Sequence, residues 1–138
     1  MISLDTSVVV RYLVADDAEQ TAAARSLIEG LTPDRPGFMS REVVIEMVWV
    51  LERAYRSARA QISDVLLELL ATDSLVLEAP DDVARAASTY RQGGAGFSDL
   101  MILAAARRQR ALPLHTFDRR LSRLAGAVLA GQPEQAAG

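Results

Sequence analysis

Four acidic residues of this 138-residue chain stand in apolar surroundings where a carboxylate is unexpected. Asp5 interrupts MISLDTSVVV, Glu46 lies within VVIEMVWVL, Asp99 lies within GFSDLMILAAA, and Asp118 follows PLHTF. Burying a lone ionised carboxylate is costly, so such a group normally has a base, a hydrogen-bond donor or a metal ion as its partner. These four acids are therefore the first candidates for a functional site.

If folding gathers the four carboxylates, their mutual repulsion requires a cation. Magnesium and manganese prefer oxygen ligands and keep several waters, so an ion held by a few carboxylates can bind a phosphate and activate a water. That chemistry is phosphodiester hydrolysis. Each acid also has a structural explanation: Asp5, Asp99 and Asp118 can stabilise helix N-termini, and Glu46 can reach solvent from the border of an apolar stripe.

The residue pattern predicts short strands alternating with helices. Strands are expected at 2–4, 37–39, 75–79 and 113–117. Helices are expected at 8–14, 18–31, 41–55, 60–72, 80–91, 98–110 and 118–126. Ser40 and Ser98 are expected to cap the helices that follow them.

Strands that alternate with helices pair in parallel, because parallel strands need a crossover that is usually a helix. We therefore expect an α/β fold with a mainly parallel sheet. In such sheets, functional sites gather at the carboxyl ends of the strands. Asp5 and Asp118 both follow expected strands, which is the first indication that they share a site.

The composition limits the chemistry. The chain has no cysteine and a single histidine, His115, which excludes disulfides, thiolate chemistry and the usual zinc sites. One domain, about residues 1–130, is expected, with a disordered tail at 131–138 rich in Gly, Gln and Ala. The N-terminus lacks the features of a signal peptide, and no run of residues approaches the length of a membrane span, so a cytoplasmic location is expected.

All 15 basic residues are arginines, the side chain best suited to binding phosphate through two hydrogen bonds, although the net charge is −3. Arg119, Arg120 and Arg123 directly follow Asp118 and are candidates for phosphate contacts. A second group, at positions 107, 108 and 110, has an equally good explanation as helix-terminal surface charge. His115 is expected to pack or face solvent, and Trp49 to lie in the core or at an interface.

The motifs LDTS, VIEMVWVL, GFSDLMILAAA and HTFDRRL resemble, in order and spacing, the PIN-domain family, and most closely its VapC-type toxin ribonucleases. The resemblance extends from Met1 to about Gly131. It implies a three-layer α/β/α sandwich around a central parallel sheet. It also implies a magnesium- or manganese-dependent endoribonuclease, normally paired with a small antitoxin protein, and the preference for RNA over DNA comes from the resemblance alone.

When the family's site residues are matched motif by motif, the resemblance implies that the acidic residues of the site are Asp5, Glu46, Asp99 and Asp118. The first, third and fourth would hold the metal ion, and Glu46 would orient or deprotonate the attacking water.

Two hydroxyl-bearing neighbours, Thr6 and Thr116, would lie near the site. Ser7 stands where the family often has Asn, so a contact made by that Asn is in doubt here. Glu42, one turn before Glu46, is the rival for the glutamate role.

The helices at 41–55 and 60–72 are broadly apolar, which indicates either a filled core or a surface for another chain. Family precedent favours a homodimer and an antitoxin helix in a groove. The main alternative function is a noncatalytic PIN-like module that binds RNA or a protein. A phosphotransfer domain also places Asp around magnesium at strand ends, but it usually needs a lysine, which this chain lacks.

Overall fold

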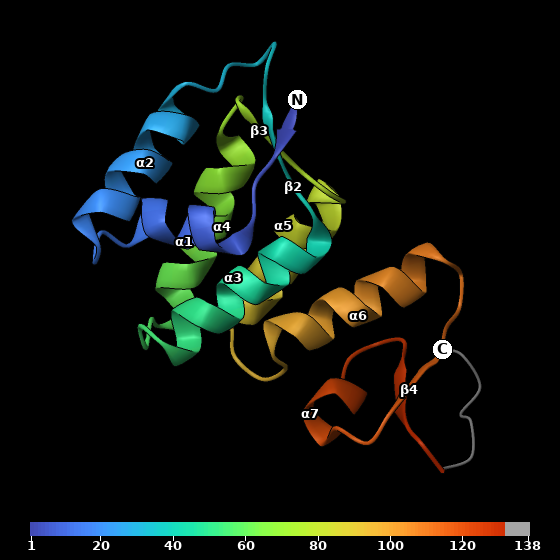
Figure 1. The fold of residues 1–138 in the computed structure, drawn as a ribbon. Helices are drawn as coiled ribbons and strands as arrows, with labels where there is room; N and C mark the ends of the chain where they lie inside the picture. The colour runs from blue at the N-terminus through green and yellow to red at the C-terminus, as the bar shows by residue number, and fades with distance from the viewer. Residues whose placement is uncertain (132–138) are drawn as a thin grey trace.

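The computed structural model describes residues 1–131, in which helices and strands alternate as the sequence predicts (Figure 1). Of the tail expected at 131–138, residues 132–138 lie outside the described residues. The strands are β1 (Ile2–Ser3), β2 (Gly37–Met39), β3 (Leu75–Leu77), β4 (Leu114–Thr116) and β5 (Ala127–Leu129). The helices are α1 (Thr6–Leu13), α2 (Ala18–Glu29), α3 (Arg41–Arg53), α4 (Arg59–Ala71), α5 (Pro80–Arg91), α6 (Phe97–Arg108) and α7 (Arg119–Ser122).

Every strand pair among the described residues is parallel, which confirms the expected α/β class. β1, β2 and β3 form one sheet in that order, with Ile2 beside Gly37 and Gly37 beside Leu75. β4 and β5 form a second sheet, with Leu114 beside Ala127. The five strands of residues 1–131 therefore divide between two sheets instead of building one central sheet.

The second sheet belongs to a C-terminal unit, residues 114–129, which consists of β4, α7 and β5. Leu121 and Ala127 of this unit pack with Leu103 in the C-terminal half of α6. Arg107 of α6 also donates a hydrogen bond of 3.0 Å to the Ala125 carbonyl. Because the unit is held on α6, β4 and α7 lie beyond that helix from β1, β2 and β3 (Figure 1).

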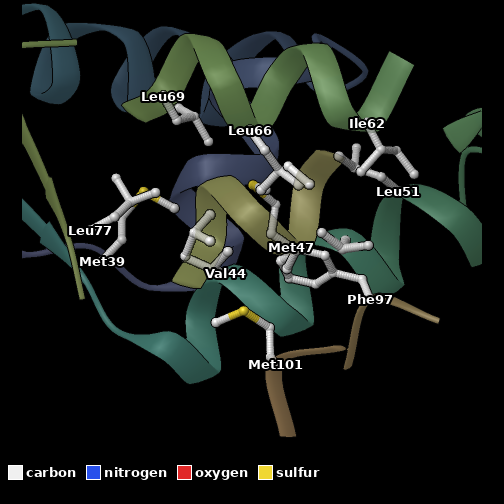
Figure 2. Close-up of a cluster of buried hydrophobic side chains, with 14 of the residues drawn as sticks. Met39, Val44, Met47, Leu51, Ile62, Leu66, Leu69, Leu77, Phe97 and Met101 are labelled. Carbon is white, nitrogen blue, oxygen red and sulfur yellow. The ribbon is translucent and has the colours of Figure 1, made fainter. Parts of the chain in front are cut away.

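The main hydrophobic core joins the three-stranded sheet to α1, α2, α3, α4, α5 and the first half of α6. Figure 2 shows Ile62, Leu66 and Leu69 of α4 pointing toward Val44 and Met47 of α3. These α3 side chains recur at helical spacing and are completely buried, as the sequence predicts. α3 therefore has one face fixed in the core, and its opposite face is available to a site.

A buried ion pair fastens α6 to this core. The Asp82 carboxylate is 7% exposed and accepts hydrogen bonds from Arg41 at 3.0 Å and from Arg108 at 2.9 and 3.1 Å. Arg41 also donates to the Met101 carbonyl at 2.8 Å. α3, α5 and α6 are thus tied together by one carboxylate, which fixes where α6 begins.

Two local predictions differ from the structure. Ser98 is not a helix cap: α6 begins one residue earlier, after Gly96, whose extended backbone takes the cap position. The helix predicted at 118–126 is shorter and ends at Ser122, and the strand β5 that follows it was not predicted. Ser40 does cap α3, since its hydroxyl accepts a 3.2 Å hydrogen bond from Val43 N–H.

Among the described residues, no helix combines the length and apolarity that crossing a membrane requires.

Candidate functional site

Asp99 lies in the first turn of α6, directly after the glycine-rich turn at 93–96. Its carboxylate lies close to Gly96: a Cβ added to that glycine would lie 3.7 Å from Asp99 Oδ2. Burial raises the pKa of Asp99, and the negative charge of Asp118 raises it further. Asp99 is therefore a half-buried carboxyl that carries its charge only at a cost.

Asp118 follows β4 and caps α7, as its position after a strand predicts. Asp118 Oδ1 accepts a 3.0 Å hydrogen bond from Leu121 N–H, and the Asp118 N–H donates to Thr116 Oγ1 at 3.0 Å. Thr116 thus fixes the backbone of Asp118. No hydrogen bond to Asp118 Oδ2 occurs within residues 1–131, so this oxygen is available to a ligand.

Asp5 occupies the cap position of α1, but its side chain does not bond the helix N-terminus. Asp5 Oδ2 instead accepts a 3.3 Å hydrogen bond from the Ser7 hydroxyl. The neighbouring Thr6 is 4% exposed, and its Oγ1 has no hydrogen-bond partner among the described residues. The end of β1 therefore presents an exposed carboxylate beside a buried hydroxyl, and capping alone does not explain either group.

Glu46 lies on the exposed side of α3, in a groove of about 800 Å³. The groove extends to Gly96, Phe97 and Ser98, the three residues immediately before Asp99. Glu42 lines the same groove, so both glutamates that compete for the role face the start of α6.

The structure brings Asp99 and Asp118 together and places Glu46 in a groove that ends beside Asp99. Within residues 1–131, no group of three or more His, Asp or Glu side chains is close enough to hold one metal ion. The expected gathering of all four carboxyls in one pocket is thus not present in this arrangement. The reason is topological: β1 and β4 belong to different sheets, so their carboxyl ends do not share an edge.

The Asp99–Asp118 pair nevertheless fits a hard divalent cation. It offers carboxylate oxygens, which magnesium and manganese prefer. Neither carboxylate forms an ion pair with an arginine in the part of the chain that the structure describes. Burial and, after it, the negative charge of Asp118 raise the pKa of Asp99, and a bound cation would relieve the repulsion between the two carboxylates.

Some of the predicted arginines line a second pocket, of about 480 Å³, next to the glycine-rich turn. Arg120 and Arg123 of the C-terminal segment face Arg59 of α4 across it, whereas Arg119 is exposed but does not line it. Sequence reasoning missed Arg59, which donates hydrogen bonds of 2.9–3.1 Å to the carbonyls of Tyr90, Gly94 and Ala95. These bonds hold the turn that precedes Asp99.

Two arginines of the other group make structural contacts that neither expectation for the group included. Arg108 pairs with Asp82, and Arg107 bonds the C-terminal unit. His115 lies exposed on β4. Trp49 was expected in the core or at an interface. It does not lie in the core, because it is 56% exposed, and the interface stays a prediction.

A model of the PIN domain matches residues 2–127, nearly the whole chain. The chain belongs to the PIN domain family. PIN domains are typically nucleases and generally depend on a metal ion.

Among solved structures, this PIN domain is similar to VapC20 from Mycobacterium tuberculosis, described as a toxin that cleaves the sarcin–ricin loop. The two chains are 20% identical, with 89% of this chain and 94% of VapC20 covered at a TM-score of 0.44. No curated protein matches the sequence.

Proposed function

We propose that this PIN domain is a divalent-metal-dependent endoribonuclease and the toxin of a toxin–antitoxin pair. The observation that carries the proposal is the Asp99–Asp118 pair, in which the charge of Asp118 raises the pKa of Asp99, in a chain that matches the PIN family. The order and spacing of the four acidic motifs support the toxin role, since they resemble VapC-type ribonucleases.

In this proposal, Asp99 and Asp118 hold the cation, with Asp5 as the predicted third ligand. A bound divalent ion polarises the scissile phosphate and lowers the pKa of a water. Glu46 orients that water and accepts its proton, and Glu42 is the alternative residue on the same groove. Thr116 keeps Asp118 in place through its backbone N–H, and Thr6 supplies a hydroxyl beside Asp5.

The arginine-lined pocket supplies the positive charge that an acidic site needs to bind a polyanion. Arg59, Arg120 and Arg123 converge there beside the turn that leads to Asp99. We propose that they bind phosphates flanking the scissile bond, and that Arg119 contacts RNA farther along the strand.

Further parts of the proposal rest on the resemblance to VapC-type toxins. They are a nuclease domain at about residues 1–130, a homodimer, inhibition by a cognate antitoxin that lays a helix in a groove, and action in the cytoplasm.

The test is cleavage of a pool of structured RNAs with magnesium or manganese, and with a chelator. We expect cleavage only with metal, and a loss of more than about 100-fold in each of Asp99→Asn and Asp118→Asn, since even groups that only orient metal ligands are worth 10- to 100-fold. Asp73→Asn, an exposed acid in the turn before β3, is the matched control and should cleave normally. Undiminished cleavage with chelator and in both variants would refute the metal site.

The alternative function, a noncatalytic module that binds RNA or a protein, predicts a different result. Purified protein would then bind RNA, and no metal would bring about cleavage. The same RNA pool, analysed for binding and for products, distinguishes the two functions.

A further inference from the structure

The exposed face of α3 carries a stripe of four residues that the core does not use: Glu42, Glu46, Trp49 and Arg53. Their spacing of four, three and four residues places them along one side of a helix. The opposite side consists of buried residues, so the helix cannot turn to cover the stripe. These four residues, called the α3 stripe below, therefore face solvent.

The α3 stripe forms one wall of the groove of about 800 Å³ described above. Gly96, Phe97 and Ser98 at the start of α6 also line it, and Asp99 is the next residue. A molecule that lies in the groove against Trp49 thus extends toward the candidate metal ligand. The groove is continuous with the proposed site.

Trp49 is the most informative residue of the stripe. Its indole is 56% exposed, although a large aromatic side chain normally gains stability by burial. The Arg53 guanidinium lies 5.8 Å from the ring centroid, at the long end of the cation–π range, so it orients the ring without covering it firmly. An exposed, oriented aromatic ring beside a nuclease site is what a nucleobase needs for stacking.

We propose that Trp49 stacks on a base of single-stranded RNA, next to the nucleotide that is cleaved, and that Arg53 then pairs with a phosphate of the same strand. This inference rests on the proposed function and names how its substrate is held. The Glu42 carboxylate accepts a hydrogen bond from the amino group of the stacked base. Together with its larger stacking area, this contact favours adenine over uracil.

The charges on the groove disfavour a protein partner over Trp49. Glu42, Glu46, Glu52 and Arg53 line the groove with Trp49 and several apolar residues, whereas the centre of a protein interface is depleted of charged residues. A protein that covered Trp49 would bury these charges and lose their hydration. A stacked base loses water only from its faces. The N–H groups on its edge can still donate hydrogen bonds to a carboxylate.

Trp49 is the only tryptophan of the chain, so its fluorescence reports on this groove alone. We would titrate the full chain with the single-stranded oligonucleotides rA8 and rU8 in chelator, where binding is measured without cleavage. We expect saturable quenching of the emission, with tighter binding of rA8. Anisotropy of fluorescein-labelled rA8 measures the same binding independently.

Trp49→Ala should weaken rA8 binding about 5- to 150-fold, the usual range for loss of one stacked base, and Trp49→Phe should stay within about threefold of the wild type. Leu67→Ala is the control, because Leu67 is also exposed, at 47%, but lies on α4. Circular dichroism of each variant verifies folding.

Three results would overturn the inference. The first is rA8 binding that leaves the tryptophan emission and the Trp49→Ala affinity unchanged. The second is an absence of oligonucleotide binding. The third is a blue shift of the emission that grows with protein concentration in the absence of RNA, which would identify a protein interface. Metal-dependent cleavage that accompanies any of these results would leave the proposed function standing, so the two failures are distinguishable.

Discussion

The two hydrophobic clusters of the molecule differ greatly in size. The body, built on β1, β2 and β3, has a core of 21 buried residues to which six helices contribute. In the C-terminal unit, the corresponding cluster has three buried residues, Leu103, Leu121 and Ala127, and one of them belongs to α6. β4 alternates between half-buried and exposed, and the adjoining Phe117 is 86% exposed. The body supplies the stability of this fold, and the C-terminal unit depends on α6.

This difference divides the candidate site. Asp99 belongs to α6, which the body core and the Asp82 ion pair hold in place. Asp118 belongs to the C-terminal unit, whose position rests on few contacts. One carboxylate of the pair is therefore rigidly placed, and the other is placed by the less stable region.

Two matched substitutions test the comparison directly. Leu66→Ala removes a fully buried side chain of the body and should lower the free energy of unfolding by about 3–5 kcal/mol, because the surrounding core cannot collapse into the cavity. Leu121→Ala, at 3% exposure in the small cluster, should cost no more than about 2 kcal/mol, because Leu114 and Leu124 beside it are only partly buried and can relax. Urea denaturation followed by circular dichroism measures both values.

Hydrogen exchange gives the control for this pair. In the wild type, backbone amides of β4 and β5 should exchange faster than those of α3 and α4, through a local opening. Leu121→Ala should accelerate exchange only in the C-terminal unit. Equal losses of stability in the two variants, with uniform exchange, would show that the molecule unfolds as one unit and that the comparison is wrong.

The next largest effect is expected at the ion pair that attaches α6 to the body. Asp82→Asn leaves Arg41 with a weaker partner and should cost about 1–3 kcal/mol, less than a fully buried pair, since Arg108 is half exposed. Burial alone would raise the pKa of Asp82, but hydrogen bonds from Arg108 and Arg41 outweigh it and lower the pKa.

The lowered pKa determines how the Asp82 contribution depends on pH. The unfolded state binds the proton more tightly, so this stability is present above about pH 4 and is lost as the pH falls through the folded pKa. The stability difference between wild type and Asp82→Asn should therefore shrink in acid. Asp64→Asn, which removes an exposed pair with Arg91, is the control and should cost less than about 1 kcal/mol. A larger loss in Asp64→Asn than in Asp82→Asn would contradict the role of the buried pair.

The sequence predicts the body well, because its signals are local. Ser40 caps α3, Pro80 begins α5, and apolar residues at helical spacing identify the buried face of α3. It predicts the C-terminal unit less well: β5 has a weak apolar pattern behind a helix of four residues, and the division into two sheets depends on packing against α6. Strand neighbours are set by tertiary contacts that no local pattern encodes.

The same distinction applies to the site. An acid at a strand end selected Asp118, and an acid in apolar surroundings at a helix start selected Asp99; the charge of the first acts on the second in the structure. These signals did not reveal Arg59, whose function as an anchor of the glycine-rich turn depends on carbonyls about 30 residues away. Trp49 was assigned to a buried or interface position from its apolar neighbours, but helical geometry aligns it with two glutamates and an arginine on the exposed side.

The smallest expected effect concerns the carboxylate pair where the two regions meet. The folded-state pKa of Asp99 is raised, so its ionisation costs stability as the pH rises above about 4. In chelator at pH 7, Asp99→Asn should thus be slightly more stable than the wild type, by less than about 1 kcal/mol, and equal to it in acid. Magnesium should raise the melting temperature of the wild type and of the control Asp73→Asn but not of Asp99→Asn, since binding to the folded state alone stabilises it. If Asp99→Asn were less stable than the wild type in chelator, the substitution would not be relieving a repulsion by Asp118. Asp99 would then stabilise the first turn of α6.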